Sequence, residues 1–454
     1  MLTNEQALDR LDHLLSLARA AGADAADAIY AGQESSGIGV RLGELEDIGR
    51  SEDEEIGLRL FLGRCSAQVS TSDLTPAALA EVVDRARLMA EGAPEDPYAG
   101  LAAQELLAPG PFADFDIFDP EAVGLAPEKL REMALAAENA ARGVSGVTNS
   151  EGGSASAGMS RVALATSHGF RGATQGSSVS VSASVVAGEG AAMQRDYDWH
   201  SARHLSDLEA AESVGRRAGE RAVRRLNPVK VPTGPLPVFF DPRVATSLLG
   251  HLLGAMNGQA IARRTSFLLG REGTAIFAPG ITIIDDPHRV RGLRSRAFDG
   301  EGLPTARREL VADGILSGWL IDAATGRQLN LPPTGHAARG TSGPPSVSAS
   351  NLWLEPGAQT PAGLMADVKL GLYVTELIGM GVNGLTGDYS RGAGGFLIRD
   401  GVLAEPVKEA TIAGNLLDMF RQLIPANDLE FRNASNAPTL RVEGMTVAGN
   451  GQGE

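Results

Sequence analysis

The sequence is poor in several residue types, and each shortage excludes a class of protein. Cys65 is the only cysteine among 454 residues, so an intramolecular disulfide and a cysteine-rich zinc site are both excluded. No apolar run approaches the roughly 18–20 residues that cross a bilayer. The first residues show no basic segment followed by an apolar one, which a secretory signal would need. We therefore expect a cytoplasmic protein.

Basic residues are also scarce relative to acidic ones. The chain has 40 Lys and Arg against 56 Asp and Glu, a net charge of −16. Such a surface repels phosphate backbones and anionic lipids, so we expect neither nucleic acid nor a membrane as partner. With 43% hydrophobic and 21% charged residues, the composition is that of a folded globular protein.

The N-terminal part predicts an α+β domain over residues 1–226. Apolar periodicity and capping residues predict helices over residues 3–22, 75–91, 126–142 and 205–226. Between them lie strand-like segments at 28–30, 38–40, 56–69, 145–149, 160–166 and 178–185. Residues 1–92 and 126–226 thus each show a helix, several strands and a helix, which we interpret as a duplicated unit.

The sequence pattern changes after the proline-rich linker 227–235. Residues 236–454 show short strands and many of the 56 glycines, which favours a mainly antiparallel β domain with packed helices. Asp241 and Pro242 predict a helix that turns Leu248 and Leu252 inward. We expect hairpin-like strands over 281–320 and a mobile loop over 338–350.

Familiar catalytic motifs are missing or out of context. His200 and His204 have zinc-helix spacing, but Ser201 stands where a zincin has glutamate, so we interpret both as surface histidines at a helix start. The glycines of 379–384 match a dinucleotide pattern outside any βαβ unit, and Asp400 lies in a predicted hairpin turn. The sequence contains no G-x-S-x-G and no P-loop.

Several polar residues in glycine-rich segments remain as candidates for lining a peptide cleft. They are His251, His336, Asp388 and Arg391. Lone histidines and turn carboxylates usually have structural roles, and this applies equally to Asp299 and Glu301. Taken by themselves, these residues define no catalytic centre.

Longer stretches resemble the TldD/PmbA family over nearly the whole chain. The densest is Val374–Phe396, and the N-terminal half matches chiefly at Asp96–Gly100. Further matches are Ser266–Leu268, Ile281–Pro287, Phe298–Gly302, Asp313–Leu316, Thr334–His336 and Thr411–Leu416. The resemblance implies a paired system, in which a TldD-type subunit holds zinc on a His-Glu-x-x-x-His helix, completed by a cysteine near its C-terminus. A PmbA (TldE) subunit of the same fold completes the pair.

The same resemblance assigns the corresponding positions in this chain. Gly250 stands for the first histidine, His251 for the glutamate and Ala255 for the second histidine, and no cysteine precedes the tail at Pro438–Val442. One imidazole does not make a three-ligand zinc site. The resemblance therefore implies the PmbA (TldE) branch, with no catalytic, metal-binding or cofactor-binding residue in this chain and zinc in the partner.

The expected function follows from this resemblance. The pair is similar to a protease that acts on small unfolded peptides, including precursors of peptide antibiotics and antitoxins. One alternative is a stand-alone peptide-binding or regulatory homodimer. Another is a modulator of DNA gyrase, which the charge of −16 disfavours for direct DNA contact. A third is an enzyme that uses His251, His336 or Asp388.

Overall fold

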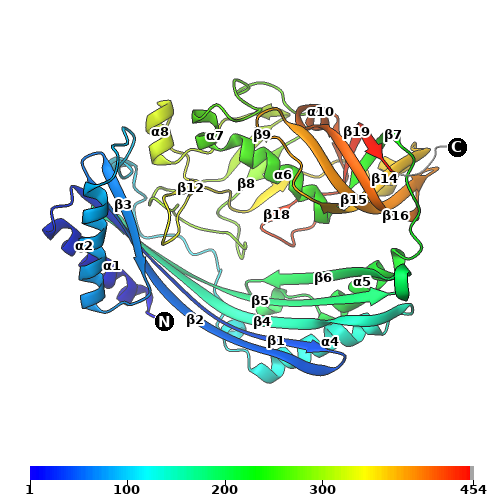
Figure 1. Ribbon diagram of the computed structural model, residues 1–454, viewed down its shortest axis with the longest axis horizontal. Helices are drawn as coiled ribbons and strands as arrows, with labels where there is room; N and C mark the ends of the chain where they lie inside the picture. The colour runs from blue at the N-terminus through cyan, green and yellow to red at the C-terminus, as the bar shows by residue number, and fades with distance from the viewer. Residues whose placement is uncertain (450–454) are drawn as a thin grey trace.

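The computed structural model describes residues 1–449, and its N-terminal half is built on one curved sheet (Figure 1). The sheet order is β3-β2-β1-β4-β5-β6, with antiparallel neighbours throughout. β1 pairs with β4, so two helix–three strands–helix units meet at that pair and the predicted duplication is confirmed. The elements are α1 (Asn4–Ala20), β1 (Ala25–Arg41), β2 (Glu44–Leu62), β3 (Cys65–Thr71), α2 (Pro76–Glu91), α3 (Pro120–Val123), α4 (Pro127–Arg142), β4 (Val147–Thr166), β5 (Arg171–Ala187), β6 (Gln194–Ala202) and α5 (Ala211–Arg224).

Alternation along the strands gives this sheet two different faces. On one face, Leu58 and Leu60 of β2 pack under α1 and α2, while Val181 and Val185 of β5 pack under α4 and α5. The opposite face turns toward the C-terminal half (Figure 1). On β5 this face carries serines, so the predicted wet and buried sides of residues 178–185 are confirmed.

Several expected boundaries in this half are wrong. Residues 31–37, expected as a turn, continue β1, and β2 extends through the exposed, acidic residues 44–55, where no apolar alternation marks a strand. The expected helix over 205–226 begins only at Ala211. His200 therefore lies in strand β6 and not at a helix start, with 8% of its surface exposed.

The C-terminal half contains a small barrel-like sheet and a second sheet. In the first, the order is β16-β15-β14-β7-β19-β17, and an extra β16–β19 pairing closes the ring; the second has the order β10-β9-β8-β13-β18. The strands are β7 (Gly234–Phe240), β8 (Ile283–Asp285), β9 (Arg308–Ala312), β10 (Ile315–Leu316), β11 (Ala337–Ala338), β12 (Ser346–Val347), β13 (Leu352–Leu354), β14 (Leu370–Ile378), β15 (Asp388–Arg399), β16 (Val402–Asn415), β17 (Leu423–Pro425), β18 (Ser435–Asn436) and β19 (Leu440–Ala448). The helices are α6 (Pro242–Met256), α7 (Gly258–Ala262), α8 (Ala323–Leu329), α9 (Pro361–Met365) and α10 (Leu416–Arg421).

Most pairings in this half are antiparallel and helices pack on the sheets, so the predicted fold class is confirmed. The turn at Asp400 joins β15 to β16 with a positive φ of 49°, as the hairpin interpretation requires. The segment 281–320 holds three short strands and much irregular chain. Within residues 1–449, no helix is long and apolar enough to cross a membrane.

The two halves are joined by a buried charge cluster and by the loop that we expected to be mobile. Arg339 of that loop pairs with Asp27 of β1, which also binds Arg59 of β2 through Nε at 3.1 Å. The backbone of Thr341 lies so close to Gly57 that a Cβ there would sit 2.1 Å from the Thr341 carbonyl oxygen. Residues 339–341 of this loop are therefore docked on the N-terminal sheet.

Candidate functional site

Helix α6 presents an open face next to the barrel. Asp241 caps it by accepting the N–H of Arg243 at 3.0 Å, and Pro242 occupies the first turn. Leu248 and Leu252 are buried in the barrel core, as predicted. On the other side, a Cβ added to Gly250 or Gly254 would meet no atom within 4 Å, so the space beside the helix is free.

His251 borders this open face and forms a cluster with two residues of β15. The rings of His251 and Tyr389 meet edge to face with centroids 5.9 Å apart. The His251 Nε2 and the Tyr389 hydroxyl are both buried without a hydrogen-bond partner among residues 1–449. Burial, and then the charge of Arg391, lowers the pKa of His251 below its ordinary value. The imidazole is therefore neutral at pH 7, and its buried Nε2 has no hydrogen-bond partner among residues 1–449.

The other two predicted cleft residues, Asp388 and His336, form hydrogen bonds away from this cluster. Asp388 accepts hydrogen bonds from Thr386 Oγ1 at 2.6 Å and Asn415 Nδ2 at 3.3 Å, and these lower its pKa. His336 is 2% exposed, and its Nε2 lies 3.2 Å from Asp285 Oδ2. The structure thus brings together only His251 and Arg391. Asp388 stabilises a turn, and His336 belongs to an interior polar network.

Sequence reasoning missed Tyr389. The available signal was the two-residue alternation of β15, which places Tyr389 and Arg391 on one face and Asp388 on the other. It also missed the aromatic side chains of β6. Tyr197 and Trp199 are 46% and 41% exposed on the face of the sheet that carries the serines.

The serine-bearing face of β4 to β6 forms a second part of the site. Ser154 and Ser182 share a hydrogen bond of 2.8 Å across the strands. Together with Tyr197 and Trp199 they line a cavity of about 520 Å³. Arg243, at the start of α6, has its guanidinium carbon 5.9 Å from the Tyr197 ring centroid, so this face and α6 are neighbours. Small polar side chains flanked by exposed aromatic ones suit an extended, peptide-like ligand.

The residues on α6 do not fit a catalytic zinc ion. Gly250 has no side chain to offer, and Ala255 is 5% exposed in the barrel core. Among residues 1–449, no group of three His, Cys, Asp or Glu side chains is arranged to hold a metal. His251 alone cannot supply the three protein ligands that such a site requires.

Comparison with known proteins identifies the family. Three family models match in order along the chain: the PmbA/TldA metallopeptidase domain 1 over 26–90, the central domain over 121–226 and the C-terminal domain over 233–449. These cover most of the sequence. The chain belongs to the PmbA/TldD metallopeptidase family.

Similar proteins extend the match to full length. Metalloprotease PmbA of Escherichia coli O157:H7 is 37% identical over 92% of this chain and 91% of its own. A PmbA homologue of Haemophilus influenzae is 34% identical over 96% and 94%. Among solved structures, a candidate modulator of DNA gyrase from Bacteroides thetaiotaomicron superposes with a TM-score of 0.90 at 28% identity, covering 99% and 100%. TldE from Thermococcus kodakarensis shares the fold, with a TM-score of 0.86 at 21% identity over 97% and 100%.

Proposed function

We propose that this chain is the non-catalytic, PmbA/TldE-type subunit of a cytoplasmic heterodimeric zinc metalloprotease. Zinc and hydrolysis reside in a TldD-type partner, and the substrates are small unfolded peptides such as peptide-antibiotic precursors and antitoxins. The observation that carries the proposal is helix α6. By sequence resemblance it corresponds to the family's metal helix, yet Gly250 and Ala255 stand where that helix has its two histidine ligands, and His251 stands where it has the glutamate that activates the metal-bound water.

The arrangement around α6 supports a role in peptide binding. The helix leaves open space beside His251, and the nearby sheet face offers hydroxyls and exposed aromatic rings around a cavity of about 520 Å³. These groups bind extended chains without strong sequence preference, because every peptide has a backbone to pair and side chains to pack. This chain therefore contributes a binding surface and shapes the cleft of the complex.

The test measures zinc content and peptidase activity of this chain, of a TldD-type subunit and of their mixture. The probe is a quenched fluorescent peptide without stable structure. We expect no stoichiometric zinc and no cleavage from this chain alone. The mixture should cleave, and light scattering should show a heterodimer. Tightly bound zinc with cleavage by the isolated chain would overturn the proposal, and a homodimer that ignores the partner would favour the stand-alone alternative.

In the active mixture, His251→Ala separates binding from chemistry. If this chain only shapes the cleft, the substitution should raise KM and leave kcat unchanged. The heterodimer should persist. A large loss of kcat with intact assembly would instead place His251 in the reaction. The matched control is His13→Ala on the exposed side of α1, far in the sequence from the cluster.

A further inference from the structure

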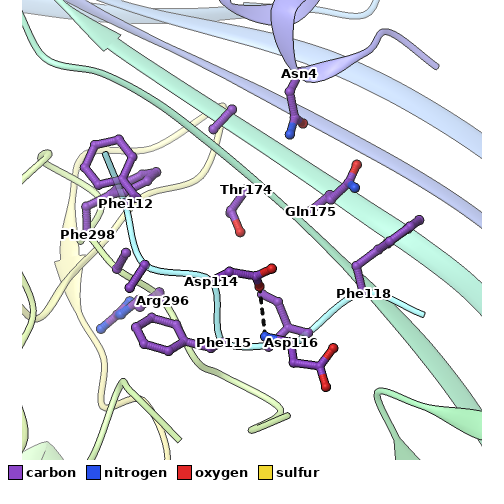
Figure 2. A pocket seen from close by; sticks show the side chains of 14 residues that line it. Asn4, Phe112, Asp114, Phe115, Asp116, Phe118, Thr174, Gln175, Arg296 and Phe298 are labelled. Carbon is purple, nitrogen blue, oxygen red and sulfur yellow. Dashed lines mark hydrogen bonds between the residues drawn. The ribbon is translucent and has the colours of Figure 1, made fainter. Parts of the chain in front are cut away.

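A second cavity, of about 350 Å³, lies between the connecting segment 112–118 and the first part of β5 (Figure 2). Because segment 112–118 crosses the sheet edge there like a strap, we call this cavity the strap cavity. Asn4 of α1, Thr174 and Gln175 of β5, and Arg296 and Phe298 of the C-terminal half complete its lining. Both halves of the molecule therefore contribute to it, and nothing in the proposed subunit role accounts for it.

The floor of the strap cavity is a free sheet edge. β6 pairs with β5 only from Val179 onward, and the N–H of Ser177 donates instead to the Ile117 carbonyl at 3.0 Å. Backbone groups alternate direction along a strand, so those of Ala173 and Gln175 point to the same side as those of Ser177. Within residues 1–449 neither has a backbone partner on that side. The backbone of an extended peptide would supply the missing hydrogen-bond partners of Ala173 and Gln175.

One end of the cavity is aromatic. Phe112 packs against Phe298 with ring centroids 4.8 Å apart and against Phe170 at 5.7 Å. Phe112 is only partly buried, so this cluster still presents apolar surface to the cavity. It suits an apolar or aromatic side chain of a ligand.

The middle of the cavity carries an unpaired carboxylate. Asp114 points into it in Figure 2, and its Oδ1 is fixed by the Asp116 N–H at 2.8 Å. Within residues 1–449 no cationic side chain pairs with Asp114, whereas Asp116 binds Arg291 Nε at 2.6 Å. Arg296 is tied to the C-terminal half, because its Nη2 donates to the Ser348 carbonyl at 2.8 Å. Asp114 is therefore free to bind a cation brought by the ligand.

The far wall of the strap cavity is polar, and one of its polar atoms lacks a hydrogen-bond partner in the described part of the chain. The Asn4 Oδ1 is buried without a hydrogen-bond partner among residues 1–449, which is costly unless a ligand or solvent satisfies it. Thr174 lines the same cavity and adds a hydroxyl nearer to Asp114 (Figure 2). These groups suit the amide of a peptide bond.

We propose that the strap cavity binds the N-terminal residue of an extended peptide. The α-ammonium lies on Asp114, the first side chain packs against Phe112 and Phe298, and the main chain runs along the free edge at Ala173 and Gln175. An N-terminal residue is the part of a peptide that joins a cation, a side chain and a peptide bond within a few ångströms of one another. The inference does not depend on zinc or on a partner subunit.

Calorimetry on the full chain alone tests this with three matched probes. They are phenylalanyl-alanine amide, its N-acetyl form, which lacks the cation, and a form N-methylated at the peptide bond, which lacks the N–H that pairs with β5. We expect acetylation and methylation each to weaken binding at least about tenfold. Asp114→Asn should weaken binding of the free amine about as much and abolish its preference over the acetylated probe.

The control variant is Asp84→Asn, which removes the same charge from the exposed side of α2 and should leave binding unchanged. Equal binding of the free and acetylated probes would overturn the proposal, as would equal binding of the methylated probe. Preference for N-acetyl-arginine amide would instead make the cavity a site for a basic side chain. Failure of all probes to bind at millimolar concentration would also refute it. None of these outcomes bears on pairing with a TldD-type subunit.

Discussion

At the scale of single residues, two carboxyl groups of one turn are more deeply buried than their turn positions suggest. Asp299 accepts the N–H groups of Glu301 and Leu303 at 2.9 Å each and of Ala337 at 3.0 Å, which agrees with a turn role. Glu301 is 5% exposed, and its carboxylate accepts, within residues 1–449, only the Ala323 N–H, at 2.7 Å. Burial raises the pKa of Glu301 to about 7. The negative charges of Asp299 and Asp322 raise this pKa further, whereas the positive charge of Arg59 lowers it.

This pKa predicts a pH dependence of stability that Glu301→Gln removes. The folded protein holds this proton more tightly than the unfolded chain, whose glutamate has a pKa near 4.5. Stability is therefore lost as pH rises from about 4.5 to about 7, by up to roughly 3 kcal/mol. Urea unfolding across this range should show that the free energy of unfolding of the variant increases relative to that of the wild type as pH rises. In the exposed control Glu81→Gln, the difference should stay constant with pH.

At the scale of secondary-structure elements, close helix packing depends on particular glycines. α5 lies so near α4 that a Cβ on Gly215 would sit 1.9 Å from the Ala137 carbonyl oxygen. Gly219, one turn later, is similarly constrained by the Ala141 carbonyl at 2.7 Å. Backbone cannot move aside as a flexible side chain can, so the two helices would have to separate.

A pair of glycine-to-alanine variants tests this packing. Gly215→Ala should lower the free energy of unfolding by about 1–3 kcal/mol, because it overpacks the α4–α5 contact. Gly250→Ala, also inside a helix but facing open space, should raise it by about 0.5–1 kcal/mol through helix propensity. Urea denaturation measures both, and a similar effect at the two positions would contradict the packing argument.

The same scale shows what sequence could and could not predict. α1, α2, α4 and α6 begin where capping residues or prolines mark them, and the predicted starts agree with the structure. The long β1–β2 hairpin was missed, because residues 44–55 are solvated on both faces and lack alternation. The cluster of His251 with Arg391 joins segments about 140 residues apart, and no local pattern reveals such contacts. The strap cavity is hidden for the same reason.

At the scale of the whole molecule, one buried carboxylate links the two halves. Asp27 is 1% exposed and lies between Arg59 of its own sheet and Arg339 of the C-terminal loop. Burial would raise the pKa of Asp27, but the two arginines outweigh it, and the pKa lies below its ordinary value. The stability that Asp27 contributes is thus present near neutral pH and is lost as pH falls through this lowered pKa.

Asp27→Asn should therefore loosen the contact between the halves. It leaves two buried guanidinium groups without their shared anion, a change that typically costs about 3–5 kcal/mol. We expect a matching drop in the free energy of unfolding and faster proteolysis within residues 338–346. Glu91→Gln, which breaks the exposed Arg87–Glu91 pair, should cost less than about 0.5 kcal/mol. Equal effects of the two substitutions would contradict the assigned role of Asp27.

The contact between the halves also bears on how the N-terminal sheet avoids aggregation. β6 is an edge strand, and its outward carbonyls at Trp199 and Tyr197 accept hydrogen bonds from Arg432 at 2.9 Å and Arg221 at 3.4 Å. Arg432 comes from the C-terminal half, so that half occupies an edge that would otherwise accept another strand. While the chain is being synthesised, the residues of this sheet emerge before Arg432 does. The last quarter of the sequence thus ends the period in which two nascent copies could join edge to edge.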